Sequence, residues 1–557
     1  MCKFICTFAA NFVRTEMIKE NFIQTISNSL INNWDKPAFT DYDTDKTTTY
    51  GQVAEQIAYL HLLLRIADIR QGDKISLIGK NDSNWVTTYL AVVTYGAIIV
   101  PILQDFHPTN TLHIINDSGS RLLFCSPNQY ESLDIHEMTN VMAIVSLTDF
   151  HPFIAAHGLD MRLLFRENIL ANFKQQYPRP FSATDVHYIH RENICLASIN
   201  YTSGTTGFSK GVLTTLNALA GNVKLCSSRH VIHPQSRQLV FLPLAHSFGC
   251  AFDFLTTFCV GAHAWYIGKT PAPRTLLEAF SKVKPTCIFT VPLILEKLYK
   301  KYILPLNDSK SADELRAMLI SAFGGEVEEV IVGGAPLDEE IGKFLSGIQF
   351  PYSVGYGMTE CAPLIAYSRA NEYKLGSCGK ALDGLMEIRI DEPDRDGVGE
   401  IVVRGEHTTL GYYHAPAASL ELFTNDGWLR TGDMGYLDEE GYLFIKGRCK
   451  TMLLGPSGQN IYPEAIEAKL NNLPYVLESL VLQRDNGLIA LVYPDYKMAD
   501  EQRIGHEELL SVMEQNRHLL NLTLARYEQI QRIILYPHEF EKTPKKNIKR
   551  FLYTQMH

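Results

Sequence analysis

The chain has 557 residues, which is too many for one hydrophobic core and predicts roughly three or four structural units. Its 46% hydrophobic and 20% charged residues are typical of a folded globular protein and exclude an intrinsically disordered one. The net charge of −10 argues against nucleic acid as the main partner, although a local basic pocket for a phosphate is compatible with it.

No stretch of the sequence predicts a transmembrane span. The best candidate, residues 90–103, has only 14 residues and ends near Pro101, whereas a span needs about 20 apolar residues. The first 16 residues lack a small-residue cleavage site, so we expect a poorly ordered leader and no signal peptide. The 11 cysteines contain no Cys-x2-Cys pair, which indicates reduced thiols, a cytoplasmic protein and no zinc site. Peripheral contact with a membrane is compatible with these features.

The first part of the chain alternates between helical and strand patterns. Periodic apolar residues predict helices, and short apolar runs predict strands. Such alternation predicts an α/β fold with a mostly parallel sheet and helices on both faces. The polar, proline-containing residues 177–192 predict a linker. The expected elements are a helix over 49–64, a strand over 73–79, a helix over 84–96, a strand over 98–102, a helix over 107–117 and a strand over 121–125.

The stretch Tyr201–Gly211 is rich in glycine, serine and threonine and contains Lys210. It follows an apolar run at 194–199 that predicts a buried strand, and open α/β sheets bind ligands at the carboxyl ends of their strands. Glycines let backbone N–H groups approach an anion, the hydroxyls add donors, and the lysine adds a charge. The stretch therefore predicts a polyphosphate site. It is not the P-loop of GTPases, because Gly-x4-Gly-Lys-Ser/Thr is absent.

Two later segments end predicted strands in glycines. Residues 329–336 contain Gly-Gly-Ala-Pro, and residues 352–360 contain Tyr-Gly-Met-Thr-Glu. Glycines there let backbone edges approach a flat base, on which an aromatic ring can stack. Glu360 supplies the type of oxygen ligand that Mg²⁺ prefers, and this ion usually takes one or two carboxylates together with phosphate oxygens.

An apolar segment follows the predicted strand and turn at residues 239–246. His246 ends the turn, and a histidine beside apolar residues is as compatible with a structural role as with a functional one. Four residues in this segment form a stripe typical of a protein core. They are Phe248, Phe252, Leu255 and Phe258.

These motifs together resemble those of the adenylate-forming enzymes, the superfamily of acyl-CoA synthetases, luciferases and peptide-synthetase adenylation domains. The resemblance covers nearly all of the chain from Met17. It implies a large multi-layer N-terminal domain with mostly parallel sheets over 17–447 and a small, mobile α+β lid domain over 448–557. The motifs that carry it, besides Tyr201–Gly211, are Pro243–His246, Gly333–Pro336, Tyr356–Glu360, Gly427–Asp433, Gly447–Lys450 and Gly455–Glu464.

The resemblance also implies roles for individual residues in binding ATP and Mg²⁺. Tyr356 stacks on adenine, Thr359 contacts the α-phosphate, and Asp433 accepts both ribose hydroxyls with help from Arg448. Lys210 and Glu360 act in catalysis, and Glu360 binds Mg²⁺ together with Thr205. The other nucleotide-binding residues are Thr202, Ser203, Gly204, Thr205, Thr206, Gly207, Gly334, Ala335, Pro336 and Gly357.

The same resemblance implies sites for the acid and for CoA. His246 closes over the acyl and phosphate groups, Phe248 and part of its stripe wall an apolar substrate tunnel, and Gly458 lines the pantetheine channel. Lys450 is the pivot of the lid. The leading hypothesis is a ligase that joins a medium- or long-chain fatty acid to CoA with ATP as co-substrate.

Two alternatives remain open. One is activation of an amino or aryl acid with delivery to a carrier protein. The amino-acid-activating relatives place an aspartate near the position of Phe248, whereas Asp253 lies further along the apolar run, which disfavours the amino-acid version. The other alternative is a non-catalytic nucleotide-binding relative.

The basic tail at residues 541–550 departs from the pattern of the family. The adenylation lysine of the family usually lies three residues before a basic residue, and counting back from Arg550 reaches Asn547. Asparagine carries no charge to offset the negative charge of the reaction. Counting back from Lys549 reaches Lys546, which we therefore expect to be catalytic. Lys549 is the next candidate, and a solvated basic tail is the alternative.

Overall fold

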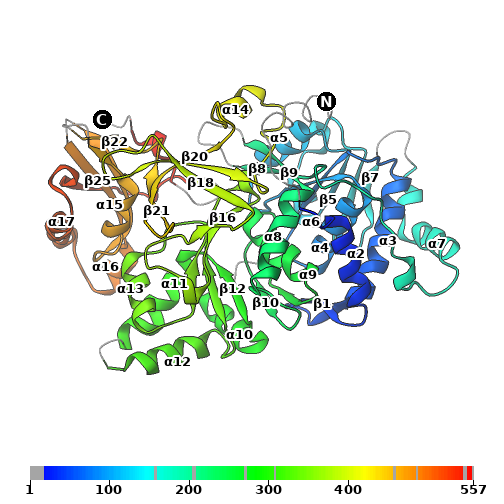
Figure 1. Cartoon of the computed structure of the whole chain (residues 1–557), viewed down its shortest axis with the longest axis horizontal. Coiled ribbons are helices and arrows are strands. Elements are labelled where there is room, and N and C mark those ends of the chain that lie inside the picture. The colour runs from blue at the N-terminus through cyan, green and yellow to red at the C-terminus, as the bar shows by residue number, and fades with distance from the viewer. Residues whose placement is uncertain are drawn as a thin grey trace. The chain divides into compact units, whose positions relative to one another are not determined.

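The structure is a computed structural model, drawn in Figure 1, with its elements coloured along the chain. It describes residues 18–155, 160–202, 209–268, 272–306, 309–455, 459–484, 487–542 and 548–554. The expected leader at 1–16 lies outside these residues. The chain divides into two compact units. The first unit comprises Met1–Ile388, Val403–Leu429 and Gly441–Leu443, and the second comprises Arg389–Val402, Arg430–Glu440 and Phe444–His557. The predicted division into an N-terminal domain at 17–447 and a C-terminal lid domain at 448–557 stays a prediction.

A seven-stranded sheet dominates the first half of the first unit. Its central strands are parallel, and antiparallel strands close both edges. This confirms the parallel arrangement that the alternating pattern predicts. The order across the sheet is β7 (Pro152–Ala155), β6 (Ala143–Ser146), β5 (Leu122–Cys125), β3 (Lys74–Ile78), β4 (Ile98–Ile102), β8 (Leu196–Thr202) and β9 (Lys210–Thr215).

Helices connect these strands, and their ends follow from local chemistry. Thr49 and Gln52 form a capping box that starts α3, and the Asp82 side chain accepts the N–H of Trp85 at the start of α4. Gly96 ends α4 with a φ of 94°, a left-handed conformation that favours glycine. The helices of this region are α2 (Phe22–Asn32), α3 (Tyr50–Ile66), α4 (Ser83–Tyr95), α5 (Pro108–Ser118), α6 (Pro127–Ser132), α7 (Arg166–Gln176) and α8 (Leu216–Ser228).

Two smaller sheets follow in the same unit. One has the order β10 (Arg237–Val240), β11 (His263–Tyr266), β1 (Pro37–Asp41) and β2 (Lys46–Thr49), so its last two strands come from the beginning of the chain. The other is fully parallel and consists of β12 (Cys287–Thr290), β13 (Glu329–Val332) and β14 (Tyr352–Val354). A π-helix at Gly249–Thr256 continues into α9 (Thr257–Cys259). The remaining helices are α10 (Pro273–Val283), α11 (Pro292–Leu298), α12 (Ala312–Ala322), α13 (Glu339–Gly347) and α14 (Pro416–Glu421).

Two further sheets follow the parallel strands. The first has the order β15 (Tyr356–Gly357), β16 (Leu364–Tyr367) and β17 (Lys380–Ala381), and its strands are antiparallel. The second has the order β18 (Met386–Asp391), β19 (Gly399–Gly405), β20 (Leu429–Leu437) and β21 (Leu443–Arg448).

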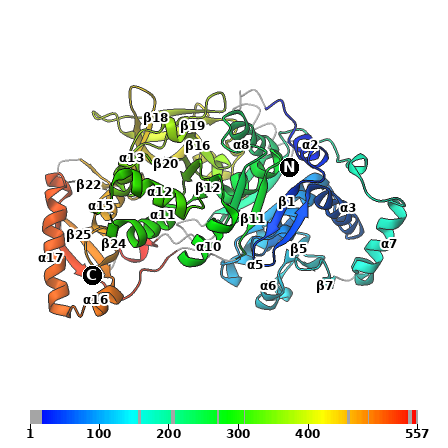
Figure 2. The same cartoon turned by 90° about the horizontal axis from the view of Figure 1, so that it is seen from below.

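The last part of the second unit has its own apolar core. Helix α17 (His506–Leu522) packs against β26 (Ile530–Leu535). Figure 2 shows α17 from below. Leu470, Val481 and Leu520 are buried in this core. The other elements are β22 (Leu453–Leu454), β23 (Asn460–Ile461), α15 (Pro463–Leu470), β24 (Val476–Arg484), β25 (Gly487–Pro494) and α16 (Tyr496–Glu501).

The predicted α/β class with mostly parallel sheets is therefore confirmed. No helix among the described residues is long and apolar enough to cross a membrane. The nine described cysteines form no disulfide with one another.

Candidate active site

The predicted phosphate-binding stretch begins and ends on paired strands. β8 ends at Thr202, β9 begins at Lys210, and these two residues face each other in an antiparallel pair. Ser203, Gly204, Thr205, Thr206 and Gly207, which complete the predicted loop, lie outside the described residues. The expectation that the stretch follows a strand of the main sheet is confirmed, and Thr202 and Lys210 mark the two ends of the loop.

Lys210 and Glu360 are 150 positions apart in the sequence, and Tyr412 connects them. The hydroxyl of Tyr412 donates to Oε1 of Glu360 at 2.8 Å. The Nζ atom of Lys210 lies 5.2 Å from the centroid of the Tyr412 ring, which is within the range of a cation–π contact. Burial and the Glu360 carboxylate raise the pKa of Tyr412, so the hydroxyl stays protonated and remains a donor.

Sequence reasoning did not identify Tyr412. It comes from the segment Thr409–Tyr413, which lies along β9. The carbonyl of Gly411 accepts the N–H of Leu213 at 3.1 Å, and the N–H of Tyr413 donates to the carbonyl of Gly211 at 2.7 Å. The only signal in the sequence is Gly-Tyr-Tyr at 411–413, which has no specific chemistry until the fold places it beside the loop.

Glu360 lies in a short 3₁₀ helix at Thr359–Cys361 and is 8% exposed. Its backbone carbonyl accepts the N–H of Thr409, and its Oε2 atom has no hydrogen bond or ion pair with a described residue. No group of three His, Cys, Asp or Glu side chains that could hold a metal occurs among the described residues. One available carboxylate oxygen fits a Mg²⁺ ion that takes its other ligands from phosphate and water.

The glycines predicted to approach a flat base lie at the carboxyl edge of the parallel sheet β12-β13-β14. Gly334 follows β13 with a φ of 82° and is exposed, as are Ala335 and Pro336. A Cβ at Gly357 would lie 2.1 Å from the Pro363 carbonyl oxygen, so this close approach requires glycine.

Tyr356 is 8% exposed and pairs with Ala366. Its predicted stacking on adenine stays a prediction, as does the contact of Thr359 with the α-phosphate.

Phe248, in the predicted acyl-binding segment, lies at the carboxyl edge of the parallel sheet β12-β13-β14. A Cβ at Gly333 would lie 3.0 Å from the tip of the Phe248 ring, so the two segments are in contact. The rings of Phe248 and Phe289 are 5.9 Å apart between centroids, and those of Phe252 and Phe289 are 5.3 Å apart and stacked. An apolar aromatic wall therefore adjoins the glycine edge. The N–H of Phe248 donates to Nδ1 of His246 at 3.3 Å.

The predicted stripe does not stay on one side of its helix. Phe258 stacks on Tyr50 at 5.0 Å and on Phe39 at 5.6 Å, within the core. Leu255 is also fully buried. The π-helical turns at Gly249–Thr256 separate Phe258 from Phe248 and Phe252, because a π-helix has a longer period than an α-helix.

Asp253 lies on this helix as well, and it is completely enclosed. It is 1% exposed, and neither of its carboxyl oxygens has a hydrogen-bond partner among the described residues. Burial raises its pKa well above the usual range for a carboxyl group, which disfavours a fixed negative charge at this position.

Comparison with known proteins agrees with this geometry. The sequence profile of the AMP-binding enzymes matches residues 29–413. The chain belongs to the AMP-binding enzyme family. This confirms the resemblance to adenylate-forming enzymes.

Individual members of this family match over most of the chain. A long-chain-fatty-acid–CoA ligase, FadD15 of Mycobacterium bovis, is 26% identical over 90% of this chain and 89% of its own. The crystal structure of ATP-bound MatB from Rhodopseudomonas palustris matches with a TM-score of 0.75 and 21% identity, over 96% of this chain and 99% of that one. The anthranilate CoA ligase AuaEII in complex with anthranoyl-AMP has a TM-score of 0.75 and 20% identity, over 98% of both chains. The family and the fatty-acid ligase relative support an adenylate-forming acid–CoA ligase activity, and the two solved structures show that the fold is shared.

The remaining predicted site residues of this AMP-binding enzyme belong to the second unit. Asp433 and Arg448 lie on β20 and β21, and the Nε atom of Arg448 is 3.5 Å from Oδ1 of Asp433. Lys450 is exposed in the turn after β21. The roles of these residues at the ribose and at the hinge stay predictions. Gly458 and Lys546 lie outside the described residues.

The C-terminal tail is attached to the second unit on both sides of residues 543–547. Lys542 and Ile548 form an antiparallel bridge, Lys542 pairs with Glu478 at 2.6 Å, and Lys549 pairs with Glu541 at 3.3 Å. Arg550 binds Glu467. Lys542 and Lys549 are therefore held by carboxylates, whereas Lys546 belongs to the short segment between them.

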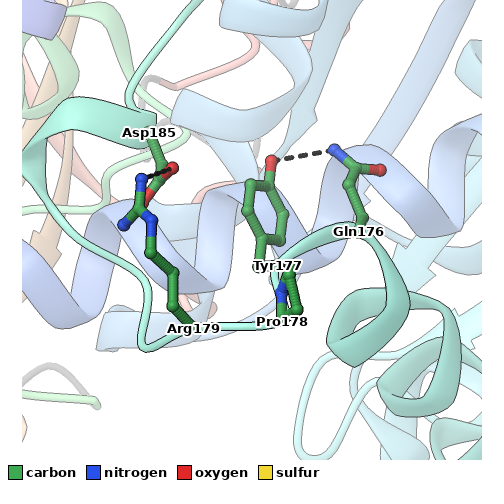
Figure 3. Close-up of a pocket in the computed structure, with 5 residues that line it drawn as sticks. All are labelled: Gln176, Tyr177, Pro178, Arg179 and Asp185. Carbon is green, nitrogen blue, oxygen red and sulfur yellow. Dashed lines mark hydrogen bonds and ion pairs between the residues drawn. The ribbon is translucent and has the colours of Figure 1, made fainter.

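Two surface pockets lie in the first unit, and neither is lined by a predicted site residue. A pocket of about 370 Å³ lies in the predicted linker, where Arg179 and Asp185 pair at 2.8 Å and Gln176 donates to Tyr177 (Figure 3). The ion pair already satisfies the charged groups of this pocket. A second pocket of about 640 Å³ is lined by Arg229, Lys380, Asp383, Glu387 and Trp428, among others.

Proposed function

We propose that this AMP-binding enzyme activates a medium- or long-chain fatty acid with ATP and transfers it to CoA. A carboxylate is a poor electrophile, so the acid first attacks the α-phosphorus of ATP to give acyl-adenylate and pyrophosphate. The CoA thiolate then attacks the activated carbonyl and releases AMP. Positioning and fixed positive charge provide the catalysis of the first step, and no nucleophile of the protein is required.

One observation supports an apolar acid above all others. Phe248 contacts Gly333 at the carboxyl edge of the parallel sheet, and the buried rings of Phe252 and Phe289 pack behind it. An alkyl chain can bury its surface against such a wall, at about 25 cal/mol for each Å² removed from water. The carboxylate of that chain would then lie beside the edge at which the nucleotide is expected.

The charged residues suit the first half-reaction. Lys210 would neutralise phosphate oxygens, and Glu360 would hold Mg²⁺ through one oxygen. The bound metal ion would withdraw charge from the phosphates. Asp433 and Arg448 would bind the ribose, and the loop of Thr202, Ser203, Gly204, Thr205, Thr206 and Gly207 would surround the phosphates.

The alternatives fit the site less well. An amino acid would need a fixed carboxylate for its ammonium group, whereas Phe248 is closer to the expected place than Asp253, which is enclosed and has a raised pKa. An aryl acid delivered to CoA or to a carrier protein is a second candidate, because anthranilate is named as the acid of a structural neighbour. A non-catalytic relative is favoured only by Asn547.

A substrate panel tests the proposal directly. We expect ATP–pyrophosphate exchange with saturated or unsaturated fatty acids, and CoA-dependent release of AMP from the same acids. Exchange limited to aryl or amino acids would overturn the fatty-acid assignment, and exchange with no acid would favour the non-catalytic relative. Acids of matched size with and without an aromatic ring separate the two leading candidates.

Replacing Lys450 by proline should separate the two half-reactions. Proline fixes φ near −65°, which would hinder rotation of the lid about this residue, and the family uses such a rotation between its half-reactions. The backbone N–H of Lys450 donates to no described residue, so the substitution removes no hydrogen bond seen there. We expect acyl-adenylate to form at a near-normal rate while thioester formation fails, measured as pyrophosphate exchange and as acyl-CoA.

Lys450→Ala is the matched control, because it removes the side chain and leaves φ free. Its rate of thioester formation should be closer to that of the native protein than the rate of Lys450→Pro is. Equal loss of both half-reactions in Lys450→Pro would mean that the residue acts in folding or in ATP binding.

A further inference from the structure

Tyr412 contacts Glu360, the predicted Mg²⁺ ligand. The assignment of Glu360 as a metal ligand rests on the proposed function. The hydroxyl of Tyr412 donates to one oxygen of Glu360, Oε1, at 2.8 Å, whereas Oε2 has no hydrogen bond or ion pair with a described residue. The two oxygens of the carboxylate are therefore not equivalent. A metal ion that approaches Glu360 meets one oxygen already bound and one oxygen available.

The position of Tyr412 is fixed by its backbone. Its N–H donates to the Oγ atom of Ser419 at 2.9 Å, and Val212 and Tyr412 form an antiparallel bridge. The two neighbouring residues, Gly411 and Tyr413, hydrogen-bond to β9 on either side. The phenol ring consequently has little freedom to leave Glu360, and the same ring faces the ammonium of Lys210.

We propose that Tyr412 is a positioning residue that restricts Glu360 to one metal-binding oxygen and so favours Mg²⁺ over Ca²⁺. Mg²⁺ needs near-ideal octahedral geometry and takes single carboxylate oxygens, whereas Ca²⁺ takes six to eight ligands and binds carboxylates through both oxygens more readily. Bidentate binding to Glu360 would displace the hydrogen bond from Tyr412. Ca²⁺ therefore loses a ligand here that Mg²⁺ does not need.

The ring of Tyr412 has a separate role. Its face contacts the ammonium of Lys210, so it orients that charge at the base of the phosphate loop. Phenylalanine at this position keeps the ring and removes only the hydroxyl. Leucine removes both, which lets the two roles be measured apart.

The test compares metal binding in Tyr412→Phe, Tyr412→Leu and the native protein. Mg²⁺ and Ca²⁺ are titrated calorimetrically into each protein with α,β-methylene-ATP present. We expect Tyr412→Phe to tighten Ca²⁺ binding at least about fivefold relative to Mg²⁺, because both oxygens of Glu360 become available. Tyr412→Leu should show the same shift and, in addition, weaker nucleotide binding. Tyr413→Phe is the matched control, because its hydroxyl does not contact Glu360, and it should leave the ratio unchanged.

The outcomes separate this inference from the proposed function. An unchanged ratio of Ca²⁺ affinity to Mg²⁺ affinity in Tyr412→Phe would overturn the positioning role. Equally weaker binding of both ions together with a lower melting temperature would also overturn it, since that result indicates a merely structural residue. Absence of metal-dependent nucleotide binding in the native protein would also overturn it. Failure of fatty acids to support pyrophosphate exchange, with the ratio shifted as expected, would overturn only the assignment of the acid.

Discussion

Replacing Lys210 by alanine is expected to slow acyl-adenylate formation by roughly 10²- to 10³-fold, the usual cost of losing one preorganised charge-stabilising group. Lys210 is the first residue of β9, directly after the predicted phosphate loop, and its ammonium lies over the ring of Tyr412. Its contribution to packing is small, because it is only half-buried. The loss should therefore appear in the rate of pyrophosphate exchange and not in the melting temperature.

Lys224 offers a matched control for this substitution. It is another lysine of the first unit, paired with Glu20 at 3.6 Å on the surface, and Lys224→Ala should leave exchange unchanged. Glu360→Ala should reduce exchange most strongly when Mg²⁺ is limiting. If folded Lys210→Ala protein exchanges pyrophosphate at the native rate, the loop works without this charge. If folded Glu360→Ala protein does so at limiting Mg²⁺, the metal assignment is wrong.

Replacing Lys546 by alanine is expected to reduce adenylation by a similar roughly 10²- to 10³-fold, while transfer from supplied acyl-adenylate to CoA continues. Counting back from Arg550 reaches Asn547 at the expected place of the adenylation lysine of the family, and asparagine carries no charge. The neighbours Lys542 and Lys549 are already paired with Glu478 and Glu541. In the sequence, Lys546 lies between Lys542 and Ile548, which form an antiparallel bridge.

Lys549→Ala tests the next candidate for the adenylation lysine. Its ion pair with Glu541 is on the surface of the second unit, and such pairs contribute only about 0–1 kcal/mol, so both half-reactions should change little. Lys545→Ala tests the other lysine of the segment. If no single alanine affects adenylation and Asn547→Lys raises it strongly, the enzyme works with an impaired lid and the assignment of Lys546 is wrong.

The elements of the first unit followed from periodicity alone. The predicted helix at 84–96 and strand at 98–102 correspond to α4 and β4, within one residue at each end. These predictions are reliable because the residues are almost all buried and the ends have strong local signals in Asp82 and Gly96. The stripe after His246 was harder to predict, because its residues are spaced as in an α-helix, whereas the structure has π-helical turns there.

The candidate active site likewise contains residues that the sequence predicted and one that it did not. Lys210 and Glu360 were identified from their motifs, since a lysine among glycines and a carboxylate after a glycine turn suggest phosphate and metal chemistry before any fold is known. Tyr412 was not identified, because its role depends on a hydrogen bond to Oε1 of Glu360 and a ring contact with Lys210. A tyrosine gives no local signal of what its hydroxyl will meet.

The sequence by itself determined the α/β class and the membership of the AMP-binding enzyme family, and it predicted which residue types would face the phosphates, because these depend on local patterns of burial and on short motifs. Only the tertiary structure decided which of these residues meet. It joined β9 to the segment Thr409–Tyr413, so that one tyrosine contacts both Lys210 and Glu360. It also separated Phe248, at the glycine edge, from Phe258, in the core. The physical reason is that contacts between distant segments depend on how sheets and helices pack, which no short stretch of sequence encodes.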